Sequence, residues 1–492
     1  MMSEYIKVIG ESTDRELVGG KGGSLSVMHN LGLPVPPGFT ITTEAWRALN
    51  SGNLKFADLW KDIAEQMKVT FPEFGEGQLV SVRSGAAQSM PGMMDTILNV
   101  GVSPDDHPLL RYNFWKSFCL ALGVDRESIQ RVTDDMLVKR GAFFLSALGS
   151  SDVSSVIGSL SSLAKETGSI PQTKMNLLKR AVQIVFDSWN SERAVAYREQ
   201  FGISHDGGTA CTIQLIVSGL SGGSGVYLTR NPQTGVDEPY IDWAEDAQGD
   251  AVVDGSVMPA TGERLKASKP KLYQELIGVG ARLEREFKDA MDIEFTISKD
   301  KLYILQCRAM KRTPTARARI ALDMVLDGIA DAGRVREYND PPVISTRVET
   351  ATTSVPFTTS LPIVPMIVRG RITLAEKPEP GLVMVRKNNT TEDLPHMLKA
   401  AAILTIVGGP TCHAALVARE SNIPAYVGMS GCYIEYGKLK TSTTFLKEGD
   451  LVTILPDGRI YAGDIETVEV SEMDRNSVRL ENLKKLLEAS HA

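Results

Sequence analysis

The stretch Gly408-Gly-Pro-Thr-Cys-His-Ala-Ala-Leu-Val-Ala-Arg419 directly follows an apolar segment, 402–407. The apolar segment is typical of a buried strand, the glycines predict a sharp turn, and the residues from His413 onward favour a helix. His413 would then lie at a helix N-terminus, where free backbone N–H groups and the helix dipole favour an anion. This environment suits a phosphoryl group on the imidazole, although a lone histidine there is more often a structural residue.

The composition excludes several classes of protein. The chain has 492 residues, 42% hydrophobic and 23% charged, which at roughly 100–200 residues per domain predicts about three or four domains. Its formal net charge of -7 argues against a nucleic-acid partner. We expect a cytoplasmic protein with no membrane partner, because the sequence has no long uncharged apolar run, no signal-peptide pattern and only five scattered cysteines.

A second glycine-rich segment, Gly19-Gly-Lys-Gly-Gly-Ser24, lies near the N-terminus. Its spacing matches neither the P-loop nor the dinucleotide-binding motif, and such glycines are often only a tight turn. The functional interpretation is a loop from which Lys21 reaches phosphates that approach the bare backbone, followed by a helix over 25–31.

A strand predicted over 78–83 ends at Arg83 and leads into a loop of small residues, 84–94. Glycines in this loop would let its backbone approach nucleotide phosphates closely, so we interpret it as a phosphate lid. A single arginine at a strand end is common, so this interpretation depends on the other phosphate-binding candidates. The lid residues singled out are Ser84, Gly85, Gly92 and Met93.

Two later strands, predicted over 293–297 and 301–306, carry polar residues at alternate positions. Asp292 and Glu294 share one face of a strand, as do Gln306 and Arg308, and four polar groups would converge if the strands pair. Carboxylate and amide oxygens suit Mg²⁺, and an arginine would neutralise transferring phosphate. The alternative is a solvated sheet face.

Together these segments resemble the pyruvate phosphate dikinase family and, more distantly, phosphoenolpyruvate synthase. The matching segments follow the family's order along the chain, which makes the resemblance specific. They are 19–23, 32–44, 80–85, 89–99, 229–235, 292–297, 302–308 and 408–419.

The resemblance implies an α/β (α+β) fold, with an ATP-grasp nucleotide-binding region followed by a swivelling phosphohistidine domain. The predicted parts are an ATP-grasp N-terminal part (1–107), a mainly helical insert (108–205), an ATP-grasp C-terminal part (206–340), a linker or hinge (341–362), the phosphohistidine domain (363–475) and a C-terminal helix (476–492).

The resemblance also implies roles for single residues. His413 matches the phosphorylated histidine, and Thr411 matches a regulatory phosphorylation site of some plant members. The segment from Gln214 through Leu215 to Val217 matches the one that flanks adenine. Lys21 and Arg83 match ATP phosphate ligands, whereas Asp292, Glu294 and Gln306 match the ATP- and Mg²⁺-binding group, with Arg308 as a catalytic residue beside them.

The sequence also departs from the family. The family's C-terminal barrel needs about 250 residues, and 79 residues follow His413, so we expect the barrel to be absent. The lid has Gly85-Ala-Ala-Gln-Ser89 in place of Gly-Ala-Arg-Ala-Ser, and residues 411–413 and 249–251 differ from Thr-Ser-His and Gly-Glu-Asp. These changes leave the role of inorganic phosphate open.

The leading hypothesis is a dikinase-type phosphotransferase. His413 takes phosphorus from ATP with release of AMP, inorganic phosphate or water removes the terminal phosphate, and the remaining phosphoryl group goes to an acceptor on a separate chain, such as a stand-alone barrel. One alternative is phosphotransfer to another small-molecule acceptor, such as an antibiotic. The other is a non-catalytic ATP-binding regulator of a true dikinase.

Overall fold

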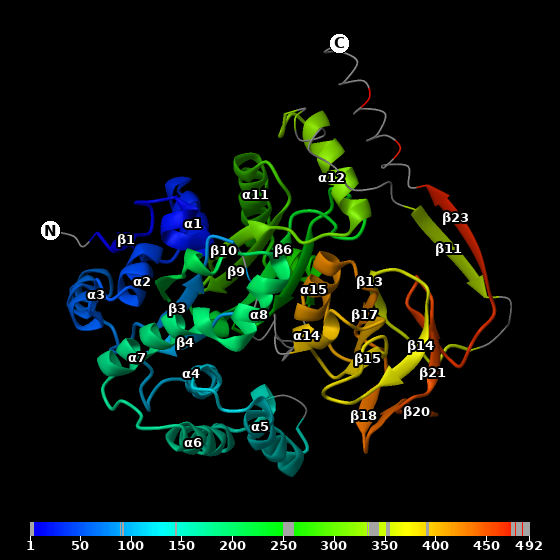
Figure 1. The fold of residues 1–492 in the computed structure, drawn as a ribbon, viewed down its shortest axis with the longest axis horizontal. Coiled ribbons are helices and arrows are strands. Elements are labelled where there is room, and N and C mark those ends of the chain that lie inside the picture. The colour runs from blue at the N-terminus through cyan, green and yellow to red at the C-terminus, as the bar shows by residue number, and fades with distance from the viewer. Residues whose placement is uncertain are drawn as a thin grey trace. The chain divides into compact units, whose positions relative to one another are not determined.

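The structure is a computed structural model that describes residues 4–88, 90, 93–142, 145–248, 260–331, 333, 344–350, 355–389, 393–473, 478 and 485. The chain forms two compact units. The first unit comprises Met1–Val217 and Tyr303–Gln306, and the second comprises Ser218–Leu302 and Cys307–Ala492. Helices and sheets occur in both units, which confirms the predicted α/β class (Figure 1).

The first unit contains a five-stranded antiparallel sheet in the order β1-β2-β5-β3-β4. Strand β5 lies at its centre, between strands that precede it by more than a hundred residues. Pairing of β3 with β5 places Arg83 opposite Thr212. The strands are β1 (Ile6–Val8), β2 (Gly38–Ile41), β3 (Val80–Gly85), β4 (Thr96–Val100) and β5 (Ala210–Leu215).

Helices α1 and α7 both pack on this sheet. The nearby α2 is preceded by its N-cap residue Thr42, whose hydroxyl accepts a hydrogen bond from the Ala45 N–H at 3.3 Å. The helices around the sheet are α1 (Arg15–Asn30), α2 (Thr43–Asn50), α3 (Phe56–Thr70), α7 (Lys174–Asp187) and α8 (Glu192–Phe201).

The region between β4 and β5 contains helices. In the described part of this region every regular element is a helix. Helices α4, α5 and α6 share a core of their own that includes Tyr112, Ile129 and Leu160. Their bounds are α4 (Pro108–Ala121), α5 (Arg126–Arg140) and α6 (Ser150–Glu166).

The second unit begins with another five-stranded sheet, in the order β10-β9-β6-β7-β8. Its strands are β6 (Gly222–Leu228), β7 (Tyr240–Ala244), β8 (Ala260–Thr261), β9 (Met291–Ser298) and β10 (Lys301–Ala309). Four residues of β10, Tyr303–Gln306, group with the first unit. The helices of this part are α10 (Gly262–Ser268), α11 (Pro270–Phe287) and α12 (Pro314–Leu326).

A mixed eight-stranded sheet follows in the order β12-β22-β21-β14-β15-β16-β17-β13. Strands β14 to β17 pair in parallel, and helix α15 packs on β13, β16 and β17 (Figure 1). The bounds are β12 (Thr358–Thr359), β13 (Leu361–Val364), β14 (Val368–Thr373), β15 (Val383–Arg386), α14 (Leu394–Met397), β16 (Ala402–Thr405), α15 (His413–Ser421), β17 (Ala425–Val427), β21 (Leu451–Ile454) and β22 (Arg459–Ala462). A small antiparallel sheet adds β18 (Tyr433–Glu435), β19 (Lys438–Lys440) and β20 (Phe445–Lys447).

The segment predicted as a linker, 341–362, contains strands. Strand β11 (Ile344–Thr350) pairs along its whole length with β23 (Thr467–Met473), and β12 and the start of β13 also fall in this segment. Threonine, valine and isoleucine are frequent here, and such β-branched residues favour strands once a partner strand is available. The segment is therefore not irregular throughout, and its role as a hinge stays a prediction.

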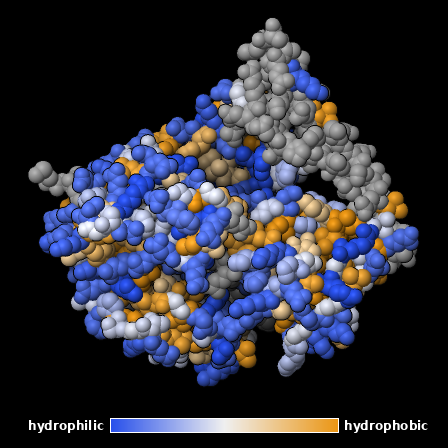
Figure 2. All heavy atoms as spheres, viewed as in Figure 1, coloured by the Kyte–Doolittle hydropathy of each residue, from blue (hydrophilic) through white to orange (hydrophobic). Residues whose placement is uncertain are grey.

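The predicted C-terminal helix, 476–492, lies outside the described residues except for Val478 and Lys485. No helix among the described residues is both long enough and apolar enough to span a membrane. On the face seen in Figure 2, hydrophilic residues cover most of the surface, with hydrophobic residues in patches between them.

Candidate functional site

The first glycine-rich segment is part of helix α1 rather than the loop that the sequence predicts. The helix is interrupted at Gly19, where φ is 69°. A Cβ at Gly19 would lie 2.0 Å from the carbonyl oxygen of Gly85, and the Gly20 N–H donates to the Ala86 carbonyl at 2.8 Å. The glycines therefore let α1 contact the backbone at the start of the predicted lid.

Lys21 continues this contact between α1 and the end of β3. Its ammonium donates a hydrogen bond to the carbonyl of Ser84 at 2.8 Å, and its side chain is half-buried. Lys21, Ser84 and Gly85 therefore lie together in the first unit. An ammonium at this place adds positive charge beside backbone groups, which is an arrangement that favours phosphate.

Arg83 contacts two other predicted site residues, Gln306 and Gln214. Its guanidinium donates to the side-chain oxygen of Gln306 at 2.7 Å and to the backbone carbonyl of Leu305 at 3.2 Å. It also approaches the side-chain oxygen of Gln214 at 3.4 Å. Arg83 is half-buried, so part of this cation stays accessible.

The remaining candidates for the adenine-flanking segment lie at the end of β5. Gln214 is buried and donates to the Pro36 carbonyl at 3.3 Å, which fixes its amide. Leu215 is the last residue of β5, Val217 lies two residues beyond it, and both are half-buried. These side chains can offer partly exposed apolar surface next to Arg83.

The far end of the predicted lid is attached to helix α8. Arg193 of α8 donates to the Met93 carbonyl at 3.1 Å and forms an ion pair with Asp95. Arg193 is not among the residues that the sequence motifs indicate, because nothing in the local sequence links it to a loop about a hundred residues earlier. Gly92 lies outside the described residues, as do Ser89 and residues 249–251.

In the second unit, Asp292 of β9 is buried and forms an ion pair with Arg308. The Arg308 Nε atom lies 2.8 Å from the Asp292 Oδ2 atom, and Asp292 is 1% exposed. Burial raises the pKa of the Asp292 carboxyl, and the nearby Arg308 partly offsets this effect. The predicted neighbours on the two strands are thus in contact, and the carboxyl is not on a solvated sheet face.

The donor set of β9 fits a hard divalent cation. The Asp292 Oδ1 atom is buried and makes no hydrogen bond, so it has a lone pair available for a cation, and half-buried Glu294 lies two residues further along the strand. Such carboxylates suit Mg²⁺, which keeps water and phosphate oxygens as further ligands. Among the described residues, no group of three His, Cys, Asp or Glu side chains could hold a metal ion alone. Gln306, the third predicted ligand, belongs to the first unit.

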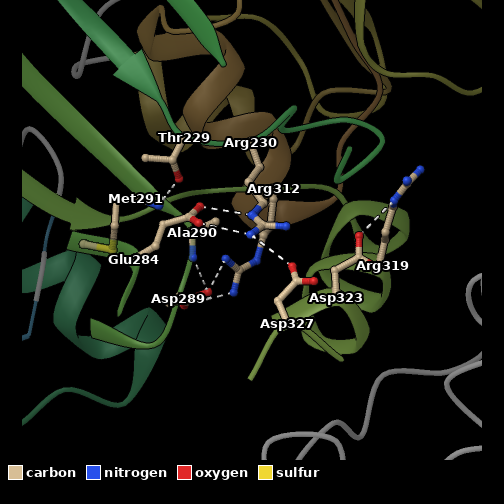
Figure 3. Close-up of polar contacts among 10 residues, drawn as sticks. All are labelled: Thr229, Arg230, Glu284, Asp289, Ala290, Met291, Arg312, Arg319, Asp323 and Asp327. Carbon is tan, nitrogen blue, oxygen red and sulfur yellow. Dashed lines mark hydrogen bonds and ion pairs between the residues drawn. The ribbon is translucent and has the colours of Figure 1, made fainter. Parts of the chain in front are cut away.

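Buried polar contacts hold the start of β9 in place (Figure 3). The Met291 N–H donates to the Thr229 hydroxyl at 2.8 Å, one residue before Asp292. Arg230, which directly follows Thr229, forms two hydrogen bonds of 3.0 Å with the Glu284 carboxylate, and both side chains are buried. Removing one partner of such a buried pair costs about 3–5 kcal/mol, so the pair holds the residue next to Thr229, which is bonded to β9.

His413 is the first residue of helix α15, as the sequence predicts. The preceding residue, Cys412, has extended backbone angles and makes no capping hydrogen bond through its side chain. The residue as a whole is half-buried, and the Nε2 atom of its imidazole is buried. His413 therefore lies where the N–H groups of the first turn and the helix dipole favour a bound phosphoryl group.

Two contacts that the sequence analysis missed hold the loop before His413. The Thr411 hydroxyl donates to the Asp242 Oδ2 atom at 2.6 Å, and Arg419 donates to the Pro410 carbonyl at 2.6 Å. Burial raises the pKa of the Asp242 carboxyl, and hydrogen bonds from Thr411 partly offset it. Arg419 stands in the same motif as His413 and could have been noticed, whereas nothing near Asp242 in the sequence indicates its role.

The fold therefore combines an α/β nucleotide-binding region with a smaller α/β domain that carries a histidine at a helix N-terminus. Comparison with known families agrees with this class. The family described as "Pyruvate phosphate dikinase, AMP/ATP-binding domain" matches residues 15–56, 55–272 and 263–327. The one described as "PEP-utilising enzyme, mobile domain" matches residues 378–458. The chain belongs to the pyruvate phosphate dikinase family, as the sequence motifs indicate.

Curated relatives match most of this chain. A pyruvate, phosphate dikinase of Clostridium symbiosum is 33% identical over 94% of this chain and 58% of its own length. One of Giardia intestinalis is 34% identical over 92% of this chain and 57% of its own length. A chloroplastic pyruvate, phosphate dikinase of Mesembryanthemum crystallinum is 34% identical over 82% of this chain and 47% of its own length. The chain thus spans about half the length of the curated relatives it matches.

Proposed function

We propose that the chain is a dikinase-type phosphotransferase that transfers phosphorus from ATP to His413 and then to an acceptor on a separate chain. The observation that carries this proposal is the position of His413, at the N-terminus of α15, in a chain of the pyruvate phosphate dikinase family. The relatives' printed names support pyruvate as the acceptor to test first.

In this proposal Lys21 and Arg83 bind the phosphates of ATP. The Lys21 ammonium lies at the Ser84 carbonyl, and the guanidinium of Arg83, near the end of β3, contacts Gln306. The segment from Gln214 through Leu215 to Val217 flanks the adenine. Phosphoryl transfer depends mainly on such positioning and on neutralising charge, which these residues supply.

Asp292, Glu294 and Gln306 are the proposed Mg²⁺ ligands. The buried and unbonded Asp292 Oδ1 atom supports this assignment. A bound Mg²⁺ would neutralise negative charge on the phosphates. Arg308, which is held by Asp292, adds a cation that stabilises charge on the transferring group.

The proposed reaction at His413 is a nucleophilic displacement. The Nε2 atom forms a bond to the β-phosphorus of ATP while the bond from that phosphorus to the oxygen of the α-phosphate breaks, and AMP leaves with that oxygen. The terminal phosphate of the pyrophosphoryl-histidine then passes to inorganic phosphate, giving pyrophosphate, or to water, giving phosphate. His413 keeps one phosphoryl group, and the first turn of α15 stabilises its charge.

Isotope placement in ATP tests this proposal. We expect the purified chain with Mg²⁺ to retain acid-labile label from β-labelled ATP, to form AMP, and to lose the label in His413→Ala. Label that comes only from the γ-phosphate, with ADP as product, would exclude a dikinase reaction. Pyruvate added alone should give no phosphoenolpyruvate, so turnover without a second protein would contradict the separate acceptor.

A non-catalytic regulator would bind ATP without forming phosphohistidine. The proposed role of Thr411 as a regulatory site is a separate prediction, tested by whether a phosphate on Thr411 stops the labelling of His413.

A further inference from the structure

The loop before His413 has an attachment point that no sequence motif indicates. Asp242 of β7 is 5% exposed, and its Oδ2 atom accepts the 2.6 Å hydrogen bond from the Thr411 hydroxyl. Thr411 is itself 4% exposed, so water cannot readily replace either partner. Both residues belong to the second unit.

The loop backbone is fitted closely to the same carboxylate. A Cβ at Gly409 would lie 3.2 Å from the Asp242 Oδ2 atom, closer than a side chain ordinarily approaches. The buried Arg419 holds the intervening residue, Pro410, through its carbonyl. Residues 409–411 are thus held from two sides, by Asp242 on β7 and by Arg419 on the helix that His413 begins.

We infer that Asp242 is a positioning residue for phosphoryl transfer to His413. By accepting the Thr411 hydrogen bond, it holds the loop so that the imidazole of His413 and the first turn of α15 keep a fixed position relative to β7. The inference rests on the proposed function. In this role Asp242 acts through Thr411 and not on the phosphorus itself.

A positioning role for Asp242 can be distinguished from a role in stabilising the folded protein. Loss of positioning should slow phosphoryl transfer from ATP but should leave the chemical reactivity of the His413 imidazole unchanged. A small donor, phosphoramidate, can phosphorylate the imidazole from solution whenever motion of the loop exposes its buried Nε2 atom, with loss of ammonia. Such a reaction needs no fixed position relative to β7. The two donors therefore separate positioning from loss of the histidine's reactivity.

The test compares initial rates of His413 labelling by β-labelled ATP and by phosphoramidate. Asp242→Ala and Thr411→Val should each slow labelling from ATP by about tenfold, equivalent to ~1.4 kcal/mol. Labelling by phosphoramidate should stay within about twofold of the wild type. Thr411→Ser and Asp242→Asn, which keep a hydroxyl donor and an oxygen acceptor, should recover most of the ATP rate.

The double variant Asp242→Ala/Thr411→Val tests whether the two residues act through their mutual contact. Its rate should equal that of the slower single variant, since the same hydrogen bond is lost. A double variant whose loss of rate is the product of the two single losses would overturn the inference. An unchanged rate of labelling from ATP in the single variants would also overturn it, and so would equal losses of rate with ATP and with phosphoramidate. The matched control is Glu238→Ala, which removes an exposed carboxylate four residues before Asp242 and should change neither rate.

Hydrogen exchange gives a readout that does not depend on catalysis. Amide exchange of the segment 408–421 should be faster in Asp242→Ala and Thr411→Val than in the wild type or in Glu238→Ala. If the wild type is never labelled by ATP, the proposed function fails, and unchanged exchange in these variants would separately overturn the role of Asp242. Thr411→Val nearly preserves side-chain volume, so it remains informative if Asp242→Ala does not fold.

Discussion

The glycine-rich segment of the first unit and the loop before His413 both bring backbone close to a proposed phosphate, but they are held differently. At Gly19 two backbones meet directly, and a single added carbon would lie 2.0 Å from the Gly85 carbonyl oxygen. Before His413, the loop is held by two side-chain hydrogen bonds, from Thr411 to Asp242 and from Arg419 to Pro410.

The difference matches what each part has to do in the proposed reaction. A site that only binds ATP gains from a rigid backbone, because less ordering is needed when the nucleotide arrives. A loop that presents the histidine to ATP and then, once phosphorylated, to another acceptor has to be released. A few hydrogen bonds can break and form again, whereas the closely packed backbones at Gly19 and Gly85, which we call the interlocked backbone, cannot separate without disturbing the fold.

The largest effect is expected at the interlocked backbone. Gly19→Ala should destabilise the protein by about 1–3 kcal/mol more than Gly32→Ala, because the added Cβ would overlap the Gly85 carbonyl and because Gly19 combines φ of 69° with ψ of 169°, which other residues rarely adopt. Gly32 is the matched control, with φ of +70° against +69° and no atom within 4 Å of an added Cβ. Denaturant unfolding measures stability, and calorimetry should also detect weaker ATP binding in Gly19→Ala. Equal losses in the two variants would contradict the interlocked description.

A change in the opposite sense is expected at Arg419. This side chain is 1% exposed, burial lowers its pKa to about 10, and its Nε and Nη2 atoms make no hydrogen bond. Because the buried charge is poorly compensated, Arg419→Met should leave the free energy of unfolding unchanged or raise it by about 1 kcal/mol. The same variant should slow ATP-dependent labelling of His413, because the Pro410 contact is lost. A loss of stability above about 3 kcal/mol would instead make Arg419 a structural residue.

The smallest effect is expected at a more exposed contact within the second unit. Lys311 forms an ion pair with Glu420 of α15, with side chains 31% and 26% exposed. Lys311→Met should cost less than about 1 kcal/mol of stability, and the loss should shrink in high salt. Thermal unfolding at low and high ionic strength measures both. A large loss of stability that does not depend on salt would mean that side-chain contacts hold α15 as firmly as the backbone contact holds Gly19, which would contradict the difference drawn between the two regions.

The sequence predicted the family, the α/β class and the helix that begins at His413. These features depend on local spacing: glycines before an apolar helix, alternation in β9 and β10, and residue types at fixed distances in one motif. The same local reasoning failed for residues 344–350, which form a strand because β23 is available to pair with them.

Motifs in the local sequence indicated Lys21 and Arg83 as candidate site residues, but they did not indicate which residues these side chains contact. Arg83 meets Gln306 across 223 residues of sequence, and Thr411 meets Asp242 across 169. No motif spans such distances, because which side chains become neighbours depends on how strands are ordered within a sheet and how sheets pack. The sequence by itself therefore determined which residues are proposed to bind phosphate and to carry phosphorus, whereas only the tertiary structure decided which buried groups hold them in position.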